Sequence, residues 1–172
     1  MVKKKKMDVL TCILLTLLLI LPLASASLKI NKKAIADSVV PEISKPAVFE
    51  LSLTNNGEDD NFVVYSLVGI SIKPNNTFFI NAGETKQVTI ELYPEKKILE
   101  TPGTFNFVYK IKSEKAGIQE DTIAIRIINL KDAIEINSYN IALDADKTKV
   151  YVENKVSQNF QEIKASFKSA FF

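Results

Sequence analysis

The stretch TFNFVYKIKSEKAGIQEDTIAIRIIN, Thr104–Asn129, decides the fold. Apolar and polar residues alternate through Phe105–Ile111, and Val108 alone breaks this period of two. After the polar link Ser113–Gly117, the alternation resumes over Ile123–Ile127. Two such runs joined by a short link that contains glycine predict an antiparallel hairpin. Each strand turns one apolar face to the same side, so a second sheet must cover that face. The sequence therefore predicts a β-sandwich.

The residues before this hairpin contain further strand and turn patterns. Ala47–Thr54 alternates cleanly, and Asn56-Gly57 behind it suits a tight turn with positive φ angles. Phe62–Ile72 is apolar on both faces, which predicts a central strand that bends or bulges at Gly69. No segment after residue 26 has a helical period. Counting the remaining short runs gives about seven strands in roughly 100 residues, the density of an all-β, immunoglobulin-like antiparallel sandwich.

The N-terminus has the layout of a secretory signal peptide. Lys3–Lys6 precede an apolar run, Val9–Leu23, which is followed by Ala24-Ser25-Ala26. A positive segment, an apolar segment and small residues in this order predict a signal helix over residues 1–26 that is cleaved after Ala26. The alternative is an uncleaved anchor, because residues 9–26 nearly reach the length of a membrane helix. We therefore expect a secreted chain or one on the extracellular face of the cell envelope, with membrane anchoring through residues 9–26 as the alternative.

Composition excludes several kinds of chemistry. The chain has 22 basic and 20 acidic residues, and removal of the signal peptide leaves 18 and 19, so no charge excess favours nucleic acid. Cys12 is the only cysteine and there is no histidine. Disulfides, Cys/His zinc sites and Ser-His-Asp triads are therefore excluded from the mature chain. We expect a protein that is not an enzyme, with no cofactor and no metal site.

A second, incomplete copy of the strand pattern follows the first domain. Val150, Val152 and Asn154 stand in the order of Leu51, Leu53 and Asn55, with an offset of 99 residues between the asparagines. This repeat predicts an immunoglobulin-like domain over residues 27–131 and a partial second sandwich over 132–172. Two or three strands cannot bury an apolar face by themselves. We expect either a truncated reading frame or a half-domain that a partner completes.

Three sequence phrases together resemble a known family. They are Leu53-Thr54-Asn55-Asn56-Gly57, Ile80-Asn81-Ala82-Gly83-Glu84-Thr85 and Pro102-Gly103-Thr104-Phe105. The combination resembles the immunoglobulin-like repeats of bacterial and archaeal envelope proteins, nearest to CARDB-type domains and the similar sandwich of some secreted glycosidases. The resemblance covers roughly residues 28–130 and implies a spacer or binding module. Its motifs concern turns and strands, and they carry no active site.

Few residues stand out as candidate sites. Asn75-Asn76-Thr77 is an N-glycosylation sequon in an expected exposed loop, so Asn75 is a possible glycosylation site. Phe78 and Phe79 point to opposite faces of one strand, and we expect one of them to be an exposed aromatic contact for sugar or protein. Five acidic residues could offer oxygen ligands to calcium, although their spacing matches no calcium loop and solvated turn charge is the simpler interpretation. They are Glu58, Asp59, Asp60, Asp144 and Asp146.

These observations predict a class of function and no ligand. We expect an exported, non-catalytic interaction or spacer module whose partner is protein or carbohydrate at the cell envelope. Nucleic acid is not expected as a partner, and contact with a membrane is expected only through an uncleaved signal or a C-terminal anchor outside this sequence. Two alternatives stay open: an accessory domain of a secreted hydrolase, and a chaperone for exported subunits that accepts a strand at a sheet edge.

Overall fold

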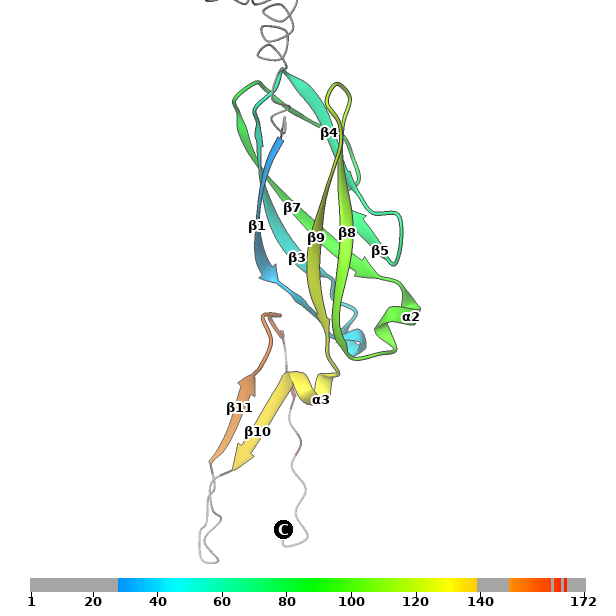
Figure 1. Ribbon diagram of the computed structural model, residues 1–172. Helices are drawn as coiled ribbons and strands as arrows, with labels where there is room; N and C mark the ends of the chain where they lie inside the picture. The colour runs from blue at the N-terminus through cyan, green and yellow to red at the C-terminus, as the bar shows by residue number, and fades with distance from the viewer. Residues whose placement is uncertain (1–27, 139–148, 162, 165, 167–172) are drawn as a thin grey trace, which may run out of the picture.

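The computed structural model describes residues 28–138, 149–161, 163, 164 and 166 (Figure 1). The expected signal peptide, with its cleavage site and the alternative anchor, lies outside these residues. The hairpin predicted from the sequence is confirmed. Strands β8 (Gly103–Ser113) and β9 (Gly117–Ile127) pair antiparallel along their whole length. Gly117 takes a φ of 87° at the end of the link, a value that favours glycine.

This hairpin forms the centre of a five-stranded sheet, which we call sheet B, with the order β2-β9-β8-β4-β6. Strands β4 (Asp60–Tyr65) and β6 (Phe78–Ile80) extend it on one side. On the other side, the short β2 (Ser38–Val39) runs parallel to the last two residues of β9.

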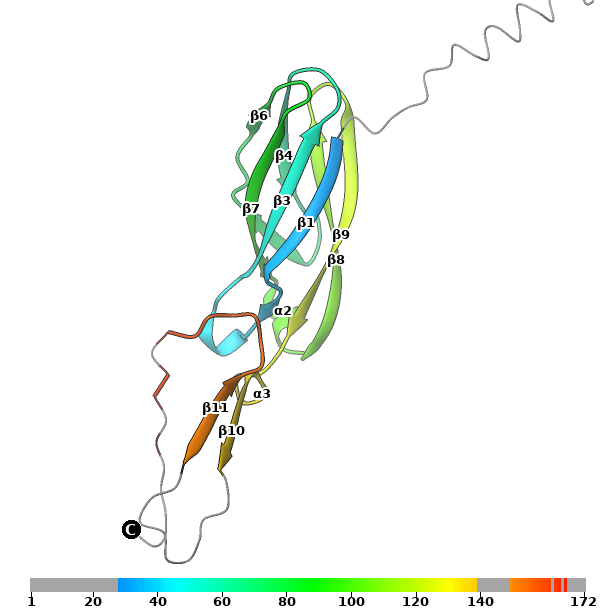
Figure 2. The ribbon, with the colours of Figure 1, turned by 90° about the vertical axis from the view of Figure 1, so that its left-hand side faces the viewer.

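A four-stranded antiparallel sheet, sheet A, covers the apolar face of sheet B. Its order is β1-β3-β7-β5, with bounds Leu28–Ala36, Ala47–Asn55, Thr85–Pro94 and Ile70–Lys73. Figures 1 and 2 show the two sheets packed face to face. The alternating side chains of both sheets meet in one core. Its fully buried large side chains include Leu51, Leu53, Phe62, Ile80, Ile90, Leu92, Tyr109, Ile111, Ile123 and Ile125.

The strand order is that of an immunoglobulin-like sandwich. Strands β1, β3, β7 and β5 take the places of strands A, B, E and D, while β4, β8 and β9 take those of C, F and G. The predicted fold class is therefore correct. The described sandwich has nine strands where about seven were expected, because β2 and β6 are only two and three residues long.

Two expectations about the strands were wrong. Phe62–Ile72 is not one central strand: the chain leaves sheet B after Tyr65 and crosses to sheet A, where β5 begins at Ile70. Gly69 makes this crossing with a φ of 77°, so the glycine that we expected to bend one strand instead separates two. The connection between β7 and β8 contains the short helix α2 (Lys96–Leu99), although this part of the sequence has no helical period.

Two other short helices lie at the base of the sandwich. They are η1 (Pro41–Ile43), a 3₁₀ turn, and α3 (Leu130–Ala133). Within residues 28–138 and 149–161, no helix is long and apolar enough to cross a membrane.

The open side between β1 and β9 is closed by a polar cluster of three residues. The Lys32 ammonium on β1 lies 2.9 and 2.8 Å from the carboxylate oxygens of Asp121 on β9, and it also donates to the Thr122 carbonyl. The hydroxyl of Tyr109, whose residue is 0% exposed, donates to Asp121 over 2.9 Å. Burial by itself would raise the pKa of Asp121, but these hydrogen bonds and one from the Thr122 N–H outweigh it, and the pKa lies below its ordinary value.

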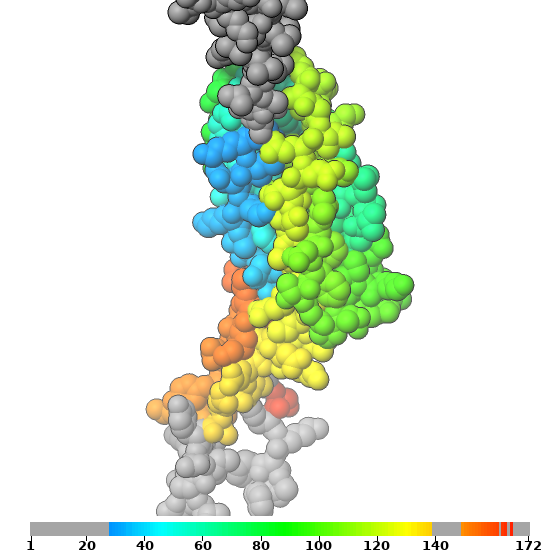
Figure 3. Space-filling view, viewed as in Figure 1, coloured from blue at the N-terminus to red at the C-terminus, as the bar shows by residue number. Residues whose placement is uncertain are grey.

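After α3, the chain forms a second hairpin of β10 (Ile134–Ser138) and β11 (Val150–Asn154). Its register begins as that of the first domain does: Ile134 lies opposite Asn154, and Leu28 lies opposite Asn55. The described residues 161, 163, 164 and 166 are not in a strand. Figure 3 shows the yellow and orange atoms of this unit directly against the base of the sandwich.

Candidate interaction surface

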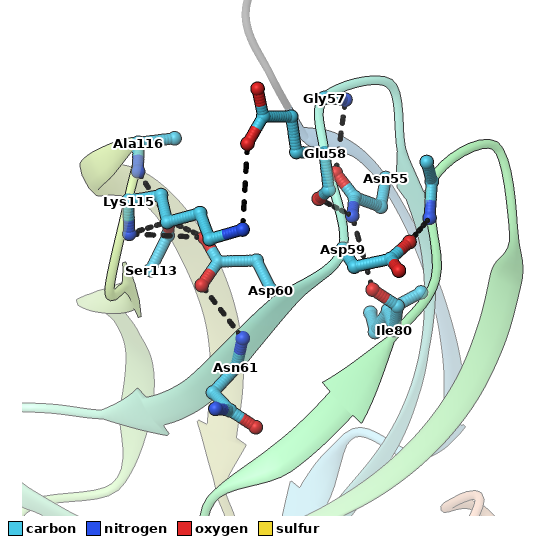
Figure 4. A network of polar contacts seen from close by, with 11 residues as sticks. Asn55, Gly57, Glu58, Asp59, Asp60, Asn61, Ile80, Ser113, Lys115 and Ala116 are labelled. Carbon is cyan, nitrogen blue, oxygen red and sulfur yellow. Dashed lines mark hydrogen bonds and ion pairs between the residues drawn. The ribbon is translucent and has the colours of Figure 1, made fainter.

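Three of the five acidic residues considered for calcium, Glu58, Asp59 and Asp60, contact the turns at the top of the sandwich (Figure 4). The buried Asp60 carboxylate accepts hydrogen bonds from the Ser113 hydroxyl, from the Lys115 N–H (3.1 Å) and from the Asn61 N–H (2.7 Å). Burial would raise the pKa of Asp60, but these bonds outweigh it and lower the pKa. Asp60 therefore joins the β8–β9 link to the start of β4, and its carboxylate is already hydrogen-bonded.

The neighbouring acidic residues form no metal site with it. Asp59 accepts a hydrogen bond from the Ala82 N–H over 2.7 Å, and Glu58 lies 3.4 Å from the Lys115 ammonium. In the part of the chain that the structure describes, no three Asp or Glu side chains are grouped as metal ligands. Asp144 and Asp146 lie outside that part.

The other predicted site residues lie on one edge of the sandwich. Asn75 is exposed in the loop between β5 and β6. The Phe78 ring packs on the core, 6.3 Å from the ring of Phe62, whereas Phe79 is 46% exposed. The structure therefore separates the two rings as alternation predicts and leaves Phe79 available for contact. Tyr65 and Tyr93 are half-buried on the outer faces of opposite sheets, so these two side chains do not face one another.

The outer faces of the two sheets differ in character. The face of sheet A carries mainly Lys, Glu, Gln, Ser, Thr and Asn side chains. Sheet B and the loop after β4 carry five of the six exposed large apolar side chains of the sandwich. These five are Leu67, Val68, Phe79, Val108 and Ile118, while the sixth, Ile35, is on β1.

Three of these side chains gather where β4 ends. Leu67, Val68 and Val108 are 69%, 80% and 50% exposed, and they line a hollow of about 510 Å³. We call these three residues the β8 patch. Ile98 of α2 and Phe107 also line the hollow, and Lys110 and Glu120, paired at 2.5 Å, lie at its rim. Exposed apolar side chains gathered around a hollow are typical of a contact surface.

The backbone of β8 is also open beside the patch. Strand β4 pairs with β8 only from Lys110 to Ser113, so within the described residues the stretch Gly103–Tyr109 has β9 as its one strand neighbour. The Ser66 hydroxyl donates to the Val108 carbonyl over 2.9 Å and occupies one position of this edge. Gly69 forms the wall of the hollow, because a Cβ there would lie 3.0 Å from Ile98 Cδ1 and 3.3 Å from Phe107 Cε1.

Sequence reasoning missed the β8 patch, although one signal for it was present. Val108 breaks the period of two in β8 because it is an apolar residue on the solvent face. Leu67 and Val68 were hidden inside Phe62–Ile72, since an apolar run gives no sign of where a strand ends.

Comparisons with known proteins assign no family and no function to this chain. No family model matches the chain, and no curated protein matches it. Solved structures similar to it include a FixG-related protein from Vibrio parahaemolyticus (11% identity, TM-score 0.47, covering 62% of this chain and 99% of that one). Others are WR4, a C. elegans MSP family member (15%, 0.32, 58% and 96%), and the periplasmic chaperone SfaE (17%, 0.34, 58% and 57%). Because these identities and TM-scores are low, we assign the fold from the strand order and register described above.

Proposed function

We propose that this chain is an exported, non-catalytic interaction and spacer module of the cell envelope, and that the β8 patch is its contact surface. The observation that carries this proposal is the difference between the two faces: five of the six exposed large apolar side chains of the sandwich lie on sheet B or on the loop after β4, and one lies on sheet A. Burying Leu67, Val68 and Val108 against a partner would remove apolar surface from water, and each side chain so buried contributes about 1.5–3 kcal/mol at most. The partner is a protein or carbohydrate of the envelope.

The finer resemblance to CARDB-type domains belongs to the same proposal. Two of the phrases on which it rests contact each other. The Gly83 N–H donates to the Asn55 carbonyl over 2.7 Å, and the Asn55 N–H donates to the Glu84 carbonyl over 2.9 Å. These contacts hold the two turns together at one end of the sandwich, and they give no active site. Secretion, absence of catalysis and absence of a cofactor are expectations from the sequence, and we keep them as part of this proposal.

One edge that the chaperone alternative could use, the long edge of β9, is blocked. A strand added there would need the N–H and C=O of Thr122, which lie in the middle of that edge. The Thr122 N–H donates to Asp121 over 2.7 Å, and the Thr122 carbonyl accepts from the Lys32 ammonium. Charged side chains placed at a sheet edge oppose pairing with another strand.

The test is binding of the exported chain to envelope fractions of the source organism. We expect saturable binding by the wild-type chain, and loss of it in the double variant Val68→Asp/Val108→Asp. The control is Ile35→Asp, which places one such negative charge at an exposed apolar position of the other sheet, and each single variant of the patch is compared with it. Equal loss in the control would contradict the β8 patch as the contact surface. Turnover of any substrate by the purified chain would contradict the non-catalytic proposal, and retention of the chain in the cytoplasm would contradict export.

A further inference from the structure

The base of the sandwich holds a loop from the following unit, Lys155–Phe160, which continues directly from β11. Residues 37–46, which lead from β1 through β2 and η1 to β3, form the surface on which this loop lies, and we call them the crossing segment. The contacts are between residues more than 100 positions apart in the chain, so they are not a consequence of local geometry.

Gln158 is the central residue of this contact. It is 5% exposed, and its side-chain amide donates to the Ser38 carbonyl and to the Pro46 carbonyl, each over 2.7 Å. Both hydrogens of the amide are therefore used, and they join the start and the end of the crossing segment. A buried amide that satisfies two backbone carbonyls cannot be removed without leaving those carbonyls unpaired.

Contacts around Gln158 hold the loop from several sides. The Ser157 hydroxyl donates to Asp37 Oδ1 over 2.5 Å, while the Asp37 N–H donates to the Ser157 oxygen over 3.0 Å. Lys45 and Arg126 donate to backbone carbonyls of the loop, at Asn159 and Lys155. Beneath these polar contacts lies a small apolar cluster with Val40, Ala133 and Val156 as its buried members.

The same loop is fixed to the second hairpin. Asn154, the last residue of β11, accepts from the Val156 N–H over 3.1 Å and donates to the Gln158 carbonyl over 2.8 Å. The Lys155 N–H donates to the carbonyl of Ala133, which directly precedes β10. Loop and hairpin are thus joined by hydrogen bonds on one side, and loop and sandwich on the other.

We propose that Gln158 is a latch that keeps the β10–β11 hairpin in one fixed orientation on the base of the sandwich. The junction is then a rigid connection, and the crossing segment 37–46 is a docking surface for the loop of the unit that follows. This goes beyond the proposed function, because it concerns the geometry of the chain and holds whatever the β8 patch contacts.

The test is a set of residual dipolar couplings of backbone amides in the full chain as exported. In the wild type, one alignment tensor should fit the amides of the sandwich strands and those of β10 and β11. In Gln158→Ala, the hairpin amides should no longer fit the tensor of the sandwich. The matched control is Asn159→Ala, whose side chain is exposed in the same loop, and it should behave as the wild type.

Chemical shifts of the sandwich core serve as the check on folding. They should be unchanged in Gln158→Ala, because Gln158 lies outside that core. Gln158→Glu keeps the size of the side chain and removes both donors, so it should release the hairpin as well. A wild type that needs two tensors would overturn the proposal, and so would variants at Gln158 that keep a single tensor.

Discussion

Asp121→Ala distinguishes between two explanations of which interaction stabilises the open side of the sandwich between β1 and β9. One explanation is the ion pair with Lys32, which is visible at the surface. The other is the hydrogen bond from the buried hydroxyl of Tyr109. The two make different predictions, because the ion-pair side chains are 38% and 33% exposed whereas Tyr109 is 0% exposed.

The magnitudes favour the hydroxyl. An ion pair with this exposure contributes up to about 1 kcal/mol, since water screens it and two side chains lose freedom. A buried hydroxyl left without its acceptor costs about 1–3 kcal/mol. We therefore expect Asp121→Ala to lower the free energy of unfolding by about 2–3 kcal/mol and Lys32→Ala by no more than about 1 kcal/mol. At 4–8 °C per kcal/mol for a domain of this size, Asp121→Ala should lower Tm by roughly 10 °C or more.

The assay is urea unfolding followed by circular dichroism, with Tyr109→Phe as the second arm of a double-mutant cycle. In the Tyr109→Phe background no hydroxyl is left unpaired, so Asp121→Ala should cost clearly less there than in the wild type. Equal losses of the free energy of unfolding in Lys32→Ala and Asp121→Ala would refute the explanation by the Tyr109 hydroxyl. The same loss from Asp121→Ala in both backgrounds would refute it as well.

Three further outcomes are expected. Gly69→Ala should destabilise the protein more than Gly117→Ala. Both glycines have positive φ, which costs about 1–2 kcal/mol for alanine, but only at Gly69 would the new Cβ also press on a core ring. Equal losses of the free energy of unfolding in urea would contradict this prediction. Because the pKa of Asp60 is lowered in the folded state, its contribution is complete above its unfolded pKa and is lost as pH falls through the folded value, so stability should fall below about pH 4. In acid titrations followed by circular dichroism, Asp60→Asn should be less stable than the wild type at neutral pH and should lose less stability on acidification. Stability curves of variant and wild type that run parallel at acid pH would count against this prediction. In a host that glycosylates exported proteins, the exposed Asn75 should carry a glycan seen as added mass, and Thr77→Ala should abolish it, whereas an unmodified wild type would end the sequon hypothesis.

The alternation of side chains was enough to predict the fold class. In β3 and in the β8–β9 hairpin, apolar residues at every second position correspond to buried positions in the structure. The pattern could not place the crossing at Gly69, because the residues on both sides of it are apolar. Alternation with a period of two does not show where the chain passes from one sheet to the other. The β8 patch was missed for a related reason, since exposed and buried apolar residues look alike in a sequence.

The repeat of asparagines was visible in the sequence, but its physical basis was not. Asn55 and Asn154 each accept a hydrogen bond from the N–H two residues ahead and donate to a carbonyl three or four residues ahead. The pattern of strand residues could align the two segments. It could not show that the second loop lies on the base of the first sandwich, because that contact depends on backbone carbonyls that every residue possesses.

The loops that follow Asn55 and Asn154 also differ in the side chains that they would bring to an end-to-end contact between copies of this protein. Counting from each asparagine, Gly57, Glu58 and Asp59 of the upper loop stand where Val156, Ser157 and Gln158 stand in the loop at the base. On the base of another molecule, the upper loop would bring two carboxylates close to that of Asp37, and it would offer no amide to replace Gln158 at the carbonyls of Ser38 and Pro46. Head-to-tail contacts that do not close into a ring produce filaments. We therefore expect the acidic upper loop to disfavour head-to-tail contacts between copies of this chain.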